Sequence, residues 1–165
     1  MTEPNSSSNN PDAIWTTIAK LHVCMLATEE EGHLVSRPMA SLARPEDGKI
    51  YFITHLQSGK VGEIGGSAAV NLAYADPHAN TYVSISGTAR TSQDRTKLRE
   101  LWGFFAEAWL PQGPDDADTA LIEVEPDIAK LWDGTRSSLI QTIKMAAAVA
   151  TQTPASGGRV EEVQM

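Results

Sequence analysis

Residues 81–91, TYVSISGTART, alternate between apolar and polar side chains and restrict the fold more than any other stretch. Val83, Ile85 and Ala89 fall on one face of an extended chain, and serine and threonine side chains fall on the other. Gly87 interrupts the apolar face, which is typical of a bulge or of a close approach by another backbone. The segment therefore predicts a strand with one face against a core.

Further strand-sized runs, rich in β-branched or aromatic residues and separated by turn signals, occur along the chain. They cover residues 22–28, 34–43, 50–54, 68–75 and 119–126, with a short extended piece at 128–134. Pro38 cannot donate to a strand ladder, so it predicts a sheet edge or bulge and keeps Arg37 extended. Five or six short antiparallel strands predict a small β-barrel, because closure removes exposed strand edges.

Helical patterns are confined to the gaps and ends of these strands. We expect helices over residues 11–21, 59–64, 93–109 and 137–150. The helix over 93–109 is predicted as one amphipathic element, because its apolar residues recur every three or four positions. Its aromatic residues Trp102, Phe105 and Trp109 indicate core or subunit interface rather than a cofactor site.

The totals fit one soluble domain. Of 165 residues, 41% are hydrophobic and 21% charged, and no apolar run reaches the ~20 residues that span a bilayer. We expect a disordered leader at 1–11, a domain at 12–150 and a flexible tail at 151–165. The N-terminus lacks the features of a signal peptide, so a cytoplasmic protein without membrane contact is expected.

Charge and cysteine content limit the partners. The net charge of −8 disfavours nucleic acid, since an acidic surface repels a polyanion.

The single cysteine, Cys24, lies within a strand and is interpreted as a small buried hydrophobe rather than a catalytic thiol. The four histidines are scattered without ligand spacing, so no metal site is expected. The common phosphate-loop, dinucleotide, nucleophile-elbow and metalloprotease motifs do not occur.

Arg37, Ser58 and Lys60 form the most informative group of polar residues. Each has an ordinary interpretation, as an exposed strand residue, a helix cap and a solvated charge. A cation in the first turn of a helix is nevertheless unfavourable unless an anion offsets it. Two cations, a hydroxyl and helix amides together are typical of a phosphate site, which spacing alone leaves as probable as the ordinary interpretation.

Aromatic and hydroxyl side chains offer weaker signals for a ligand wall. Tyr82, Ser84 and Ser86 share the polar face of their strand, which we interpret as solvated. Trp132, in LWDG, follows the last strand and precedes a turn, so it either stacks on a planar ligand or closes one end of the barrel.

The order of the motifs SRPM, YFIT, SGKVGEI, VNLAYADPHANTYVSISGTAR, LWGFFAEAWLPQGPDD and AKLWDG resembles the pyridoxamine 5'-phosphate oxidase-like split-barrel flavoproteins, in their general-stress-protein branch. The resemblance implies a six-stranded antiparallel split barrel, mainly β with flanking helices. It also implies a homodimer with FMN in each of two clefts between the subunits. The implied cofactor-binding residues are Arg37, Pro38, Met39, Ala40, Ser41, Ile53, Thr54, Ser58, Gly59, Lys60 and, from the partner subunit, Trp132.

The chain departs from the true oxidases of that family. Their substrate-binding Lys would fall in the segment Ser41-Leu42-Ala43, and their C-terminal Arg-x-His is replaced by a segment with Arg136 and no histidine. We therefore do not expect pyridoxamine phosphate oxidation. An FMN-dependent oxidoreductase of unknown small-molecule substrate and a flavin-binding sensor without turnover remain open, as do split barrels that use the deazaflavin F420 or haem. No catalytic residue is identified.

Overall fold

The computed structural model describes residues 11–134 and 159–165, and these form a mainly β structure with short helices. The helices are α1 (Pro11–Leu21), η1 (Pro45–Asp47), α2 (Gly59–Ile64), α3 (Arg95–Leu101) and α4 (Phe104–Trp109). The strands are β1 (Val23–Glu30), β2 (His33–Ala40), β3 (Leu42–Arg44), β4 (Lys49–His55), β5 (Ala68–Asp76), β6 (Thr81–Ser92), β7 (Thr119–Asp133) and β8 (Arg159–Gln164). Among the described helices, none is long and apolar enough to cross a membrane.

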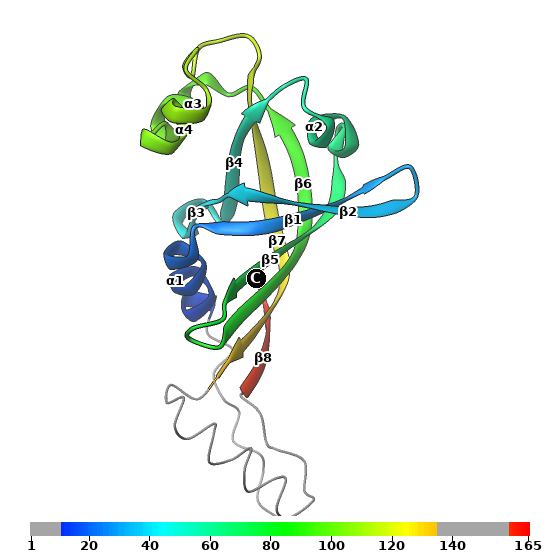
Figure 1. Cartoon of the computed structure of the whole chain (residues 1–165), viewed down its shortest axis with the longest axis vertical. Helices are drawn as coiled ribbons and strands as arrows, with labels where there is room; N and C mark the ends of the chain where they lie inside the picture. The colour runs from blue at the N-terminus through cyan, green and yellow to red at the C-terminus, as the bar shows by residue number, and fades with distance from the viewer. Residues whose placement is uncertain (1–10, 135–158) are drawn as a thin grey trace, which may run out of the picture.

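All the strands belong to one antiparallel sheet, ordered β2-β1-β5-β6-β7-β4-β3, with β8 also paired to β7 (Figure 1). The two ends of this order, β2 and β3, are consecutive in the chain and separated by Ser41 alone. A sheet whose opposite edges are joined by one residue must be rolled, as in a barrel. Ser41 fixes this junction, since its amide donates to the carbonyl oxygen of His22 at 2.7 Å. Pro38 lies in the edge strand β2, as predicted.

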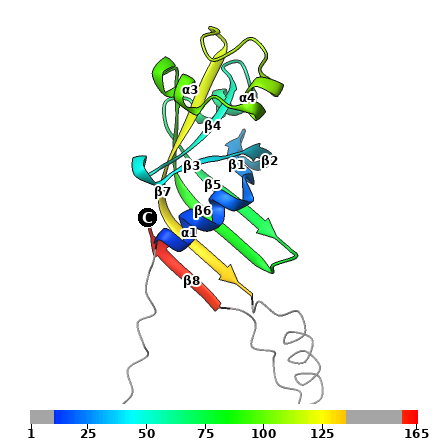
Figure 2. The same cartoon turned by 90° about the vertical axis from the view of Figure 1, so that its left-hand side faces the viewer.

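The core fills the inner side of the rolled sheet. Alternate residues of β1, β5, β6 and β7 are buried there, including Leu26, Leu72 and Ile85. Helix α1 covers this side through Ile14 and Ile18, and Figure 2 shows it lying in front of the strands. The helix predicted over 11–21 and the apolar face predicted from residues 81–91 are both confirmed.

Strand number differs from the prediction. Within residues 11–134 and 159–165 the sheet contains eight strands, against six expected from the resemblance. Residues 159–164, expected to be part of a flexible tail, form β8, and Val163 is buried in the core against the β7 residue Ala129. The prediction was wrong there because a short segment of low apolar content can still be held by a neighbouring strand. The helix predicted at 137–150 lies outside the described residues, as does almost all of the predicted leader.

The predicted close approach at Gly87 is confirmed. The register between β6 and β7 shifts at Ser86/Gly87, and Gly87 lies opposite Pro126. A Cβ atom on Gly87 would lie 2.3 Å from the carbonyl oxygen of Glu125. The bulge also explains why β7 continues through Pro126, since proline is tolerated where the ladder is interrupted. The last strand and the extended piece predicted after it are therefore one strand.

The single helix predicted over 93–109 is wrong. The chain forms α3 and α4, separated at Trp102 and Gly103, both of which have extended backbone angles. Leu98 in α3 is buried, whereas Trp109 in α4 is 81% exposed. The helical period continues through the sequence, but the helix axis changes direction at Gly103, so the aromatic residues of α4 do not join the face that α3 buries.

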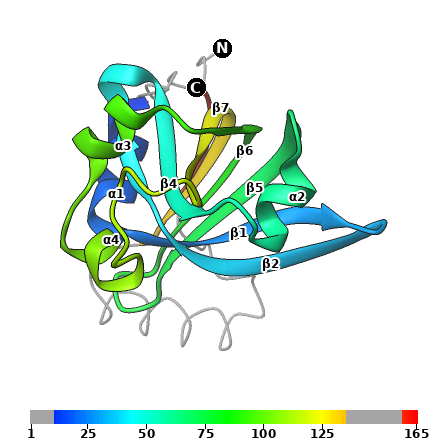
Figure 3. The ribbon, with the colours of Figure 1, turned by 90° about the horizontal axis from the view of Figure 1, so that it is seen from above.

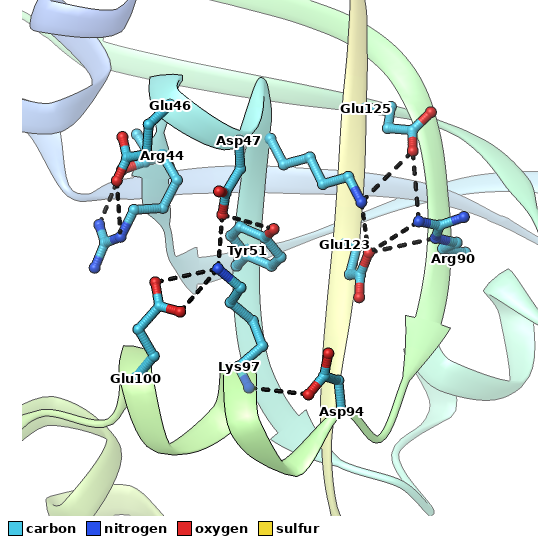
Figure 4. A network of polar contacts seen from close by, with 12 residues as sticks. Arg44, Glu46, Asp47, Tyr51, Arg90, Asp94, Lys97, Glu100, Glu123 and Glu125 are labelled. Atoms are coloured by element: carbon cyan, nitrogen blue, oxygen red, sulfur yellow. Dashed lines mark hydrogen bonds and ion pairs between the residues drawn. The ribbon is translucent and has the colours of Figure 1, made fainter.

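A network of charged residues lies on the outer side of β4, β6 and β7 (Figure 4). The Glu123 carboxylate is almost buried and accepts hydrogen bonds from Lys49 at 3.0 Å and from Arg90 at 3.2 Å. Burial alone would raise the pKa of Glu123. The hydrogen bond and charge of Lys49, with contributions from Ser92 and Arg90, outweigh burial and lower that pKa below its ordinary value.

Replacing Glu123 by glutamine is expected to cost about 1–2 kcal/mol of folding free energy at pH 7, because charge-assisted hydrogen bonds are lost. A carboxylate whose pKa is lowered on folding stabilises the fold above its unfolded pKa of about 4.5 and loses this contribution as pH falls through the folded value. The difference between wild type and variant should therefore shrink below about pH 4.5 in urea unfolding experiments.

Glu125 provides the matched control for this prediction. It lies near the same two cations, at 3.7 Å from Lys49 and 3.6 Å from Arg90, but its side chain is 59% exposed. Glu125→Gln should change stability little, because exposed ion pairs contribute little. A difference at Glu123 that stayed constant from pH 7 to pH 3 would contradict the assignment.

Candidate functional site

Arg37 points toward the inner side of β2. It lies opposite the buried Leu26 of β1, and residues directly opposite in an antiparallel pair share one face. Its Nη2 donates to the hydroxyl of Thr28 at 3.2 Å, and Thr28 is 1% exposed. Arg37 as a residue is half-buried, and its guanidinium is held by a buried hydroxyl. This is not the environment of a freely solvated strand residue.

Ser58 marks the start of α2, which packs against β1, β5 and β6 and lies beside the β1–β2 hairpin (Figure 3). Ser58 occupies the N-cap position, as predicted, but its side chain makes no capping hydrogen bond. Its Oγ instead lies 3.4 Å from Oγ1 of the buried Thr54. The ordinary interpretation of Ser58 as a side-chain cap is therefore not supported, and two hydroxyls lie together at this end of β4.

The turn between Thr54 and Ser58 is held by Asp118, which precedes β7. The backbone amide of Leu56 donates to the Asp118 carbonyl oxygen at 2.6 Å, and that of Gln57 donates to its carboxylate at 3.3 Å. His55 Nδ1 lies 3.2 Å from the same carboxylate. Asp118 thus contacts three successive residues, and it fixes the chain that leads into Ser58.

The remaining predicted residues of this part of the chain divide between two faces. Pro38 and Ala40 are exposed on the outer side of β2, whereas Met39 packs partly against the core. Ser41 is buried, with its hydroxyl donating to the His22 carbonyl oxygen at 3.3 Å.

Ile53 packs with Leu98 of α3, on the opposite side of β4 from Thr54. Gly59 and Lys60 begin α2, and the Lys60 side chain lies outside the described part of the chain.

Trp132 lies on the outer face of the sheet, away from the Arg37 side chain. It pairs with Tyr82 across β6 and β7, and the two aromatic residues line a shallow hollow of about 400 Å³ with Asn80 and Gly134. Within one chain, Trp132 faces outward and Arg37 faces inward, so the structure does not bring them together on one surface. A planar group could rest against this aromatic pair only from outside the sheet.

Two residues of the site escaped the sequence analysis. Thr28 could have been found, because it is a polar residue at an inward position of the alternating strand that contains Cys24 and Leu26. Asp118 gave no such signal, since it contacts residues 55–57 across a sequence separation of about 60 positions. Cys24 is buried as interpreted, and burial raises the pKa of its thiol to about 12. It is therefore not a thiolate nucleophile at neutral pH.

The described donors near Arg37 are its guanidinium and the Thr28 hydroxyl. A guanidinium with a hydroxyl beside it is chemically able to bind an anion such as phosphate. The described residues contain no group of three or more His, Cys, Asp or Glu side chains that could hold a metal ion. No general acid or base is assigned among the described side chains of this region.

Comparison with known proteins identifies relatives. The family model described as "Pyridoxamine 5'-phosphate oxidase like" matches residues 9–155. The Neurospora crassa protein bli-3 is 26% identical over 170 residues, covering 97% of this chain and 81% of that protein.

Solved structures share the fold. The general stress FMN/FAD binding protein of Xanthomonas citri is 26% identical, with a TM-score of 0.66, over 77% of this chain and 89% of that one. General stress protein 26 of Bacillus anthracis is 22% identical, with a TM-score of 0.61, over 72% of this chain and 92% of that one, and supports the fold alone.

Proposed function

The chain belongs to the pyridoxamine 5'-phosphate oxidase-like family, and from this premise we propose that it binds FMN as a general-stress-type flavoprotein. The relative from Xanthomonas citri is described as binding FMN or FAD, which supports a flavin as the ligand class. Of the two flavins we propose FMN, because its terminal phosphate is the group that the cations predicted at Arg37 and Lys60 would bind.

The observation that carries this proposal is the arrangement of Arg37. Its guanidinium is held by Thr28, and the hydroxyls of Thr54 and Ser58 lie together at the start of α2. These donors would hold the FMN phosphate, with Gly59 and Lys60 beside them. The backbone from Pro38 to Ser41 and from Ile53 to Thr54 would line the flavin ring. The Ser58 hydroxyl makes no helix-capping bond, so it would be able to donate to a phosphate.

We further propose a homodimer in which Trp132 of one subunit approaches the flavin of the other. Support comes from its position on the outer face next to Tyr82, where a ligand held by a second subunit could reach it. A shared site would make cofactor binding and dimer formation interdependent.

FMN, when bound, would supply electron-transfer chemistry, and the protein would bind, orient and shield it. We propose a flavin-dependent oxidoreductase acting on a small molecule. The segment Ser41-Leu42-Ala43 offers no cation for a substrate phosphate, so the substrate is not expected to be a pyridoxamine phosphate.

The test is a titration of the purified full-length chain with FMN and, separately, with riboflavin, followed by visible absorption. FMN should bind with the two absorption bands of a flavoprotein, and riboflavin should bind at least tenfold more weakly because it lacks the phosphate. NADH or NADPH is then added anaerobically. Bleaching of the bound flavin's visible absorption indicates an oxidoreductase, whereas an unchanged spectrum indicates a protein that only binds flavin. A chain that binds F420 or haem but not FMN would refute the proposed cofactor.

Asp118→Ala is expected to weaken FMN binding roughly tenfold and to leave riboflavin binding unchanged. Its carboxylate holds Gln57 and His55, and losing one hydrogen bond to a charged group corresponds to about 1.4 kcal/mol. Asp115→Ala is the control, because Asp115 lies in the same loop but pairs with the exposed Arg99. Equal losses for FMN and riboflavin would show that Asp118 supports only the general structure.

A further inference from the structure

Residues 93–118 connect β6 to β7 and return to the proposed phosphate site at their end. The first part of this connection forms α3 and α4, and a loop over residues 110–118 leads into β7. The helix α3 is fixed in place, because Leu98 and Leu101 are buried against the outer side of β4 and β7. Side chains of α3 can therefore hold the loop that follows α4.

Arg95, the first residue of α3, ties this loop to the helix. Its Nη1 donates to the carbonyl oxygens of Pro114 and Thr119, each at 3.0 Å. These two carbonyl groups bracket residues 115–118, so one guanidinium nitrogen holds both ends of the stretch that contains Asp118. Arg95 is half-buried, and a planar guanidinium with several fixed donors suits two acceptors at once.

Thr119 adds further hydrogen bonds within the same loop. Its side chain is fully buried, and its hydroxyl donates to the Gly113 carbonyl oxygen at 2.9 Å. Its amide donates to the Asp116 carbonyl oxygen at 3.1 Å, and the amide of Asp118 donates to the Asp116 carboxylate at 2.8 Å. The loop is thus held through its backbone, which gives Asp118 a defined position.

Arg99 reaches the same loop from the same helix but contacts it differently. Its guanidinium lies 2.6 Å from the carboxylate of Asp115, and the two side chains are 59% and 62% exposed. An exposed pair of this kind contributes little to stability. Arg95 and Arg99 therefore bring the same charge to one loop, but Arg95 holds backbone carbonyl groups and Arg99 holds an exposed side chain.

We propose that Arg95 is a positioning residue for the phosphate site and acts through Asp118. By holding the loop on both sides of Asp118, it places the carbonyl and carboxylate groups that bind the amides of residues 56 and 57. That turn in turn sets the position of Ser58 and the start of α2. This role rests on the proposed FMN site and deepens it by adding a residue of α3, which lies on the opposite side of β4 from Thr54.

The test is the substitution Arg95→Met in the full-length chain, titrated with FMN and separately with riboflavin. Methionine keeps an unbranched side chain but cannot donate to the two carbonyl groups. FMN affinity should fall roughly tenfold, as expected for Asp118→Ala, while riboflavin affinity should stay within about twofold of wild type. The double variant of Arg95→Met and Asp118→Ala should bind FMN as weakly as Asp118→Ala alone, because residues that act through one contact are not additive.

Hydrogen exchange without any ligand tests the positioning step by itself. The backbone amides of residues 56 and 57 should exchange at least about fivefold faster in Arg95→Met than in wild type, because their acceptors are held less firmly. Thr119→Val removes the hydroxyl bond to Gly113. It should change exchange and FMN affinity in the same direction, and it serves as an independent variant if Arg95→Met folds poorly.

Arg99→Met is the matched control, because it removes the same charge from the same helix. It should leave FMN affinity and the exchange at residues 56 and 57 unchanged. Equal losses of FMN and riboflavin affinity in Arg95→Met, full additivity with Asp118→Ala, or unchanged exchange in folded Arg95→Met would each overturn the role of Arg95. A wild type that ignores FMN would instead refute the proposed function, while the exchange measurement still decides whether Arg95 positions the turn.

Discussion

Replacing Arg37 and Lys60 together by alanine is expected to abolish retention of FMN through gel filtration, with affinity reduced on the order of a thousandfold. Two charge-assisted contacts to the phosphate would be lost, each contributing about 1.5–3 kcal/mol. Arg37 is chosen because Thr28 already holds its guanidinium on one side, which lowers the ordering cost for that side chain. Lys60 is included because it follows Ser58 and Gly59 in the segment that the sequence analysis predicts to bind the phosphate. Isothermal titration with FMN measures the effect.

The riboflavin affinity of the same double variant should change much less, because riboflavin has no phosphate for Arg37 and Lys60 to bind. Arg99→Ala, which breaks only the surface pair with Asp115, is the control for general loss of an arginine. Thermal unfolding should show that the double variant remains folded. Undiminished FMN affinity in the double variant would refute the phosphate site at these residues.

The second large effect is expected at Gly87, where alanine should destabilise the fold by about 3 kcal/mol or more. The added Cβ would lie 2.3 Å from the Glu125 carbonyl oxygen and 3.0 Å from Pro126 Cα. Both neighbours are backbone atoms, which cannot rotate away as a flexible side chain would. Relief of the contact requires β6 and β7 to separate at the bulge. Urea unfolding at pH 7 measures the loss.

Gly66→Ala is the comparison for Gly87, since nothing lies within 4 Å of a Cβ added at Gly66. Its unfolding free energy should stay within about 1 kcal/mol of wild type. If Gly87→Ala were as stable as Gly66→Ala, the close contact at the bulge would not describe the protein in solution.

Local patterns were sufficient to predict most strands. The alternation in residues 81–91 predicted the inner and outer faces of β6, and Pro38 predicted an edge, because these features depend on neighbouring residues alone. The patterns failed at the end of α3 and at β8. Periodicity over 93–109 continues across Gly103, but the change of direction there depends on the backbone angles of Trp102 and Gly103. Strand β8 forms because β7 presents an edge to it, which its own sequence does not reveal.

The sequence also predicted part of the candidate site. Residue type and position singled out Arg37 and Ser58, and their roles toward FMN stay predictions. Thr28 stands out in the sequence as a polar residue at an inward strand position, but its contact with Arg37 follows from the pairing of β1 with β2. Asp118, in the loop before β7, could be identified only from the folded chain. Contacts between residues so far apart in sequence follow from the topology of the sheet rather than from any local motif.

The junction at Ser41 limits how this segment can change in length. Because β2 and β3 are separated by one residue and pair with different strands, an insertion or deletion there cannot be absorbed by a loop. A shift of one residue in β2 would turn Arg37 to the outer side of the sheet and Pro38 to the inner side. The turn at residues 77–80, by contrast, joins two paired strands and is a loop that can absorb a change in length. Homologous chains should therefore vary in length at that turn while keeping the spacing from Arg37 to Ser41 constant.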